Sequence, residues 1–317
     1  MSTQPNAMPD TPLDARVGPV TLSATRPFYW SVRRELWEYR SIYLAPLAIA
    51  GAILLAFPFV LFHHLPHIMR TLSSLDASQQ RDALAQPYDV AAGLIMAAAF
   101  IVSVFYSVDC LYGERRDRSI LFWKSLPVSD LTTVLAKAFI PLFILPMLAF
   151  VIAVITQAIM LLFSSVVLLA SGLSVATLWT QLQLPQTLLM LLYHLVTAHM
   201  LWFAPFYAWL LLVSAWARRA PFLWAVLPPL AIYAVEKIAF NTTHFASWVA
   251  YRFAGPEAFN LSASPGLSAQ AGGVSMTGMT SLDPEKFFST PGLWFGLIVA
   301  AAFLFAAARL RRYRGPI

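Results

Sequence analysis

The sequence is poor in charge. Only 11% of its 317 residues are Asp, Glu, Lys or Arg, and its mean hydropathy is +0.68. A soluble domain averages about 25% charged residues. Charge at this level cannot cover a globular surface. The composition therefore excludes an ordinary soluble protein and indicates an integral membrane protein.

Cysteine is nearly absent as well. Cys110 is the one cysteine of the chain, which excludes an intrachain disulfide and a thiolate metal cluster. Histidine offers no better set of ligands, because His194 and His199 are five residues apart and lie on different sides of a helix, whereas metal sites need converging ligands. We expect no metal and no other cofactor.

No stretch matches Gly-x-x-x-x-Gly-Lys-Ser/Thr, the loop that cradles nucleotide phosphates. The chain is therefore not expected to be an enzyme that hydrolyses ATP, and any such activity belongs to a separate subunit. The net charge of +6 is of the sign that favours nucleic acid. The basic residues nevertheless lie beside the ends of apolar runs, so we expect a lipid bilayer as their partner and no nucleic acid.

Long apolar segments dominate the rest of the chain. Each is close to the about 20 residues that a helix needs to cross the hydrocarbon layer. The sequence therefore predicts an all-α, polytopic integral membrane protein with six transmembrane helices. We expect the spans at about residues 42–62, 88–108, 142–169, 188–215, 221–240 and 292–308.

Lys and Arg are distributed unevenly around these segments. If the N-terminus is inside, 16 of the 21 basic residues lie in inner segments, and five lie outside. The inner ones fall in residues 1–41, 109–137, 218–219 and 309–314. Cytoplasmic loops carry such an excess, so the distribution predicts an even number of spans and two cytoplasmic termini.

Two N-terminal stretches precede the first span. Residues 1–26 are rich in Pro, Ser, Thr and Asp and have no apolar period, which predicts a disordered cytoplasmic tail. Residues 27–41 (PFYWSVRRELWEYRS) interleave aromatic residues with Arg and Glu, a pattern that favours the lipid headgroup zone. We expect an interfacial amphipathic helix there; the alternative is that these residues only flank the first span.

The stretch from Tyr106 to Leu131 is the most densely charged part of the chain and lies between two long apolar runs. Glu114 to Arg118 form a cluster of mixed sign, Ser119 to Lys124 form an amphipathic piece, and Pro127 ends it. A charged loop with an apolar helix face suits docking to a soluble partner. The alternative is a solvated loop that only sets topology, but topology requires basic residues and no acidic ones.

Two short motifs in this stretch carry a resemblance to a known family: Glu114-Arg115-Arg116-Asp117-Arg118-Ser119, followed by Ser125-Leu126-Pro127-Val128-Ser129. Together they resemble the loop between transmembrane helices 2 and 3 of ABC-2 type transporter permeases. Arg118 departs from the pattern, because many relatives carry Gly there. With the predicted topology, the resemblance extends over most of residues 27–314.

The resemblance implies the membrane-spanning subunit of a bacterial ABC exporter in the inner (cytoplasmic) membrane. Its partners would be a second permease subunit, in a homodimer or heterodimer, and a separate ABC ATPase (nucleotide-binding) subunit. The loop would act as a cytoplasmic coupling helix that docks on the ATPase. The residues implied in this coupling are Glu114, Arg115, Arg116, Asp117, Arg118, Ser119, Phe122 and Trp123.

Polar residues inside the spans are candidates for lining a pathway, or alternatively for hydrogen bonding between helices. They are Ser103, Ser107, Gln157, His194 and Thr197. Glu236 and Lys237, near the outer end of the fifth span, are either functional intramembrane charges or markers of the membrane boundary, with the Lys237 stem reaching outward.

Two other functions remain open. One is a non-transporting assembly or sensor protein, whose loop docks a partner without ATP-driven motion. The other is a membrane-embedded enzyme. An enzyme needs a converging catalytic set, and the expected spans offer only Asp89, at the edge of the second, and Glu236 as acidic residues.

Overall fold

The computed structural model describes residues 25–71, 77–172, 174–182, 184–262 and 284–317. These residues form helices and no strands, which confirms the all-α expectation. Six helical segments in this part of the chain are long and apolar enough to cross a membrane. They are Ser41–Phe59, Ala83–Arg116, Asp130–Ala170, Leu178–Trp202, Pro221–Phe240 and Pro291–Tyr313.

Helices make up nearly all of the described chain. In chain order they are α1 (Thr25–Glu38), α2 (Ser41–Thr71), α3 (Ala77–Arg116), α4 (Ile120–Ser125), α5 (Asp130–Phe139), the π-helix η2 (Ile140–Ile144), α6 (Leu145–Ala170), α7 (Val175–Leu182), α8 (Leu184–His194), the π-helix η3 (Leu195–Trp202), α9 (Ala204–Trp216), α10 (Pro221–Phe240), α11 (His244–Ser262), α12 (Pro284–Ser289) and α13 (Pro291–Tyr313).

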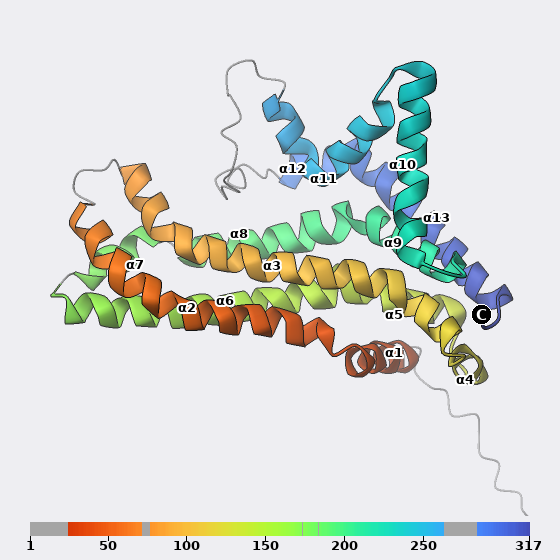
Figure 1. The fold of residues 1–317 in the computed structure, drawn as a ribbon, viewed down its shortest axis with the longest axis horizontal. Coiled ribbons are helices and arrows are strands. Elements are labelled where there is room, and N and C mark those ends of the chain that lie inside the picture. The colour runs from red at the N-terminus through yellow and green to blue at the C-terminus, as the bar shows by residue number, and fades with distance from the viewer. Residues whose placement is uncertain (1–24, 72–76, 173, 183, 263–283) are drawn as a thin grey trace, which may run out of the picture.

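Four long segments, α2, α3, α5–α6 and α8–α9, form a bundle in which α3 packs on α2, α6 and α9, and α2 also packs on α6 (Figure 1). Helix α13 packs along α9, while α10 rises steeply away from the end of α9 and α11 turns back toward the bundle. Helices α1, α4, α5 and the C-terminus lie at one end of the bundle, and α7 lies at the other. The segments predicted to be cytoplasmic therefore meet at a single end.

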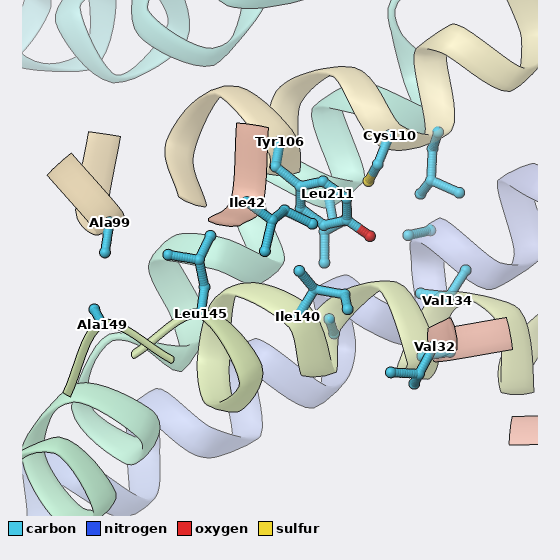
Figure 2. Close-up of a cluster of buried hydrophobic side chains, with 14 of the residues drawn as sticks. Val32, Ile42, Ala99, Tyr106, Cys110, Val134, Ile140, Leu145, Ala149 and Leu211 are labelled. Carbon is cyan, nitrogen blue, oxygen red and sulfur yellow. The ribbon is translucent and has the colours of Figure 1, made fainter. Parts of the chain in front are cut away.

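The largest buried cluster lies where α1, α2, α3, α5, α6 and α9 meet (Figure 2). It is built from branched aliphatic side chains and alanines, among them Ile42, Ile95, Ile140 and Leu145, which are fully buried. Small residues such as Ala99 and Ala149 let the helix backbones approach closely, as is usual in membrane bundles. Many other apolar side chains face outward, as a helix surrounded by lipid requires.

Proline shapes two of the long segments. Pro141 has no N–H to continue the α-helical ladder, and the chain passes through it as the π-helix η2 before α6 begins. Pro205 stands in the first turn of α9, directly after η3 and the break at Phe203. Inserted π turns keep backbone groups bonded inside a long helix, so both segments continue across the bundle.

The fourth span differs from its expected limits. Residues 188–215 were expected to form one helix, but the apolar helix runs from Leu178 to Trp202, and Ala204–Trp216 is a separate, shorter helix. Pro205 fits the break, because a proline is well accommodated in the first turn of a helix, where its missing N–H would have no partner.

One other expectation falls at the edge of the described chain. The disordered tail at residues 1–26 lies outside the described residues, except that Thr25 and Arg26 already belong to α1.

Candidate functional site

The end of the bundle that carries α1, α4 and the C-terminus holds an extended polar network. The Arg115 guanidinium donates to the carbonyls of Ala215 (2.7 Å) and Ala217 (3.0 Å) at the end of α9. The N–H of Ile317 in turn donates to the carbonyl of Arg115 (3.2 Å). These bonds join the end of α3, the end of α9 and the C-terminal residues.

A buried charge cluster lies within this end, and we define it by six residues: Arg34, Glu35, Glu114, Asp130, Lys137 and Arg311. The Lys137 ammonium lies 2.8 Å from Glu35 Oε1 and 3.3 Å from Glu114 Oε1. Arg34 pairs with both Glu35 (2.9 Å) and Glu114. The six residues come from α1, α3, α5 and α13.

Arg311 completes the buried charge cluster from α13. Its guanidinium lies 3.2 Å from Glu114 Oε2 and also pairs with Asp130 at the start of α5. Glu114 therefore contacts three cations, and its side chain is only 1% exposed. A carboxylate removed from water is stable only when paired and hydrogen-bonded, and this one is.

Neutral donors and acceptors surround the cluster. The Tyr106 hydroxyl donates to Glu35 Oε2 (2.8 Å), and Lys137 also donates to the carbonyl of Cys110 (2.9 Å). Burial alone lowers the pKa of Arg34, but the nearby carboxylates Glu35 and Glu114 outweigh it, so that the pKa is raised. The Arg34 guanidinium therefore stays charged.

The charged loop is divided into an inner and an outer part. We expected Glu114 and Arg115 to pair with a partner subunit, and this does not fit their burial: they are 3% and 4% exposed and bond within the chain. Arg116, Asp117 and Arg118 are exposed. Arg116 Nε lies 2.9 Å from Asp117 Oδ1, and this contact lowers the pKa of the Asp117 carboxyl.

Helix α4 follows directly and presents an apolar face. Ile120 is buried, whereas Leu121 and Phe122 are 59% and 61% exposed. The Ser119 hydroxyl lies 3.4 Å from the carbonyl of Glu114. The next residues anchor the helix: the Arg34 guanidinium stacks over the Trp123 ring at 3.8 Å.

Lys124 anchors the same helix to the C-terminus. Its ammonium donates to the carbonyls of Arg312 (3.2 Å) and Arg314 (3.1 Å). Helix α4 is thus bonded to α1 on one side and to the end of α13 on the other, while its apolar face is left open.

The polar residues of the spans are not brought together. The hydroxyls of Ser107 and Thr197 donate to carbonyls four residues earlier in their own helices. Gln157 Nε2 donates to the carbonyl of Tyr88 (3.1 Å), and Tyr88 is 15 positions, or about 22 Å of helix, before Ser103. His194 is partly buried in α8. These residues are distributed along the length of the bundle, and Ser107 and Thr197 bond within their own helices.

The side chains of Glu236 and Lys237 have different surroundings. The Glu236 carboxylate accepts hydrogen bonds from the Thr242 hydroxyl (2.9 Å) and from the backbone N–H groups of His244 (2.6 Å) and Phe245 (2.8 Å). It therefore caps the start of α11, where free N–H groups need an acceptor. Lys237 is exposed. This arrangement supports the boundary interpretation and gives Glu236 a structural role.

Five members of the buried charge cluster were not among the expected site residues: Arg34, Glu35, Asp130, Lys137 and Arg311. Lys137 carries a clear sequence signal, because it is the one charge that interrupts the apolar run from residue 131 to residue 169. Glu35 carries a weaker sequence signal, because it is one of several charged residues interleaved with aromatic ones in residues 27–41. In the part of the chain that the structure describes, no three His, Cys, Asp or Glu residues converge as metal ligands.

Comparisons with models of protein families, with curated proteins and with solved structures gave no match.

Proposed function

We propose that this chain is the membrane-spanning subunit of an ABC exporter of the ABC-2 type, and that it works with a separate ATPase subunit in a bacterial inner membrane. The proposal rests on the motif that runs from Glu114 to Ser129 and on six apolar segments that suit a transmembrane domain. A second permease subunit would complete the transporter.

The observation that carries the proposal is the open face of α4. Leu121 and Phe122 project from a six-residue helix at the end of the bundle, beside the exposed charges of Arg116 to Arg118. An exposed apolar pair rimmed by polar residues is typical of a protein contact. In this proposal α4 docks on the ATPase through Leu121 and Phe122.

The buried charge cluster provides a mechanical connection from α4 to the spans. Arg34 stacks on Trp123 and pairs with Glu114, and Glu114 pairs with Lys137 and Arg311. A push on α4 therefore reaches α1, α3, α5 and α13 through direct contacts. Packed elements joined in this way move as a unit, which is what a stroke delivered by ATP hydrolysis requires.

Helix α1 suits the membrane interface in the same proposal. Its outer face carries Tyr29, Trp30 and Trp37, which are more than half exposed, and the Arg33 guanidinium lies over the rings of Trp30 (5.1 Å) and Trp37 (4.6 Å). Aromatic rings with Arg favour the headgroup level. Phe28 instead packs inward against Phe139.

The test is a pull-down of tagged protein in gentle detergent, comparing the native chain with the double variant Leu121→Ser/Phe122→Ser. We expect the native chain to retain a protein that mass spectrometry identifies by a Gly-x-x-x-x-Gly-Lys-Ser/Thr motif and that azido-ATP labels on illumination. The double variant should lose it. Both side chains are exposed, so the substitutions leave the fold unchanged.

Tyr313→Ser is the matched control, because Tyr313 is 70% exposed at the same end of the molecule. This variant should retain the ATPase. Equal retention by the native chain and the double variant would remove α4 as the docking element. The absence of any such ATPase from the native sample would favour the assembly or sensor function instead.

A further inference from the structure

A large apolar cleft lies between the bundle and the α10–α11 pair, far in the chain from the buried charge cluster. Its volume is about 740 Å³, within the about 300–1,000 Å³ of sites that bind small molecules. Its walls come from α3, η3, α9, α10, α11 and α13, and include the aromatic side chains of Phe203, Phe206, Phe222, Trp248 and Phe253.

One charged residue lines the cleft. Arg252 on α11 is 8% exposed. Its guanidinium donates to the carbonyl of Trp202 (3.3 Å) and to that of Gly292, and lies over the rings of Trp202 (4.5 Å) and Trp248 (5.9 Å). Arg252 Nε is buried and has no hydrogen-bond partner among the described residues.

The groups around Arg252 suit a cation, but they do not neutralise its charge. No carboxylate pairs with it among the residues that the structure describes. Carbonyls and ring faces offset part of the cost of burying the charge, yet burial still lowers the pKa of the guanidinium. A buried charge is stable when it is paired with an opposite one, so the site favours an anion.

Gly296 on α13 makes room for this side chain. A methyl group on Gly296 would overlap the Arg252 guanidinium. The guanidinium is therefore held closely against the α13 backbone at the wall of the cleft, with its position determined from three directions: Trp202, Gly292 and Gly296.

The cleft is continuous with a surface that suits hydrocarbon. Leu230 and Ile232 line it from α10, and both are more than half exposed on that helix. If α10 spans the membrane, as its length and composition allow, a lipid chain reaches the cleft from the side without crossing water. A water-soluble anion would lack such a route.

We propose that the cleft binds an acidic lipid, with its phosphate headgroup on Arg252 and an acyl chain along the aromatic wall. The inference rests on the proposed function, for which it names the substrate class. Arg recognises phosphate through a planar fork of donors, and the aromatic wall shields the chain from water.

The test is a binding measurement on the purified protein by native mass spectrometry, with dioleoylphosphatidylglycerol and dioleoylphosphatidylcholine as probes. The two lipids share their acyl chains and differ in net charge. We expect the native chain to bind the acidic lipid more tightly, and Arg252→Gln to lose about tenfold in affinity for it, because one charge-assisted contact accounts for about that factor. Arg219→Gln, at an exposed arginine, should bind as the native chain does.

Ala225→Phe provides a second variant that keeps Arg252. Ala225 is buried and lines the cleft, so a phenyl ring there fills the space for the acyl chain and should weaken binding of both lipids. Equal affinity of the native chain for the two lipids would overturn the proposal, as would undiminished binding by Arg252→Gln or Ala225→Phe. No ATPase takes part, so a negative result leaves the exporter proposal standing. A failed pull-down leaves the lipid binding standing but removes the lipid's role as the substrate.

Discussion

Arg118 shows how a single residue can conflict with its backbone. It adopts a φ of 58°, in the left-handed region where a side chain raises the energy and glycine does not. The turn it makes joins the end of α3 to α4. A glycine at this position, which the ABC-2 pattern commonly has, would suit the observed backbone better than the arginine.

We therefore expect Arg118→Gly to stabilise the protein by about 0.5–1 kcal/mol, the left-handed penalty less the extra flexibility of glycine in the unfolded chain. A thermal unfolding scan in detergent would show this as a higher midpoint. The comparison variant is Arg116→Gly, at the last position of α3, where the backbone is not left-handed, so glycine relieves no strain and the midpoint should not rise. A lower midpoint for Arg118→Gly would contradict the expectation.

The same loop shows what residue-level prediction achieved. Its charge, its short helix and the end before Pro127 all followed from the sequence, because composition and proline act locally. The sequence did not reveal which of these charged side chains are buried and which are exposed. Glu114 and Arg115 are buried and Arg116 and Asp117 are exposed, and four adjacent charged residues carry no local signal that separates the two pairs.

At the scale of elements, Glu114 is the residue through which α1, α3, α5 and α13 are joined, since it contacts Arg34, Lys137 and Arg311. Glu114→Gln keeps the shape of the side chain but leaves these cations with less opposing charge. Breaking a buried pair typically destabilises a protein by about 3–5 kcal/mol. We expect a loss of about 3 kcal/mol, read as a large fall of the unfolding midpoint in detergent.

Asp117→Asn is the matched control for this substitution, because it removes one carboxylate charge three residues away on an exposed side chain. Exposed ion pairs contribute little, so the midpoint should hardly change. If Glu114→Gln and Asp117→Asn behaved alike, the buried charge cluster would not be the element that holds the four helices together.

Helix limits illustrate which element-level features are readable. The apolar helix at Pro221–Phe240 agrees with the expected 221–240, because Pro221 marks its start clearly. The fourth span was misjudged, since its apolar character continues past the break at Phe203. An apolar run in the sequence indicates that a segment is buried in lipid or protein, but it does not indicate where the helix bends.

At the scale of the whole molecule, the structure gathers four segments that are distant in the chain at one end of the bundle: α1, the loop after α3, residues 217–220 and the C-terminus. The positive-inside count assigns these same segments to the cytoplasm. The arrangement is consistent with that topology, and an accessibility experiment tests it directly.

Cys110 is buried, so the native chain should not react with a membrane-impermeant maleimide. Single cysteines in place of Arg118, Arg219 and Tyr313, all exposed, should react in inside-out vesicles and remain unlabelled in intact spheroplasts. Thr243→Cys, between α10 and α11, should show the opposite pattern. Labelling of position 118 and position 243 from the same side would refute the predicted topology.

The sequence by itself determined the membrane class, the all-helical architecture and the positions of most apolar helices, because hydrophobic length is a property of neighbouring residues. Only the tertiary structure decided which charges are paired inside. Glu114 meets Arg34 across 80 positions of the chain and Arg311 across 197. Contacts between residues so far apart depend on how the helices pack, so a local pattern of residues does not reveal them.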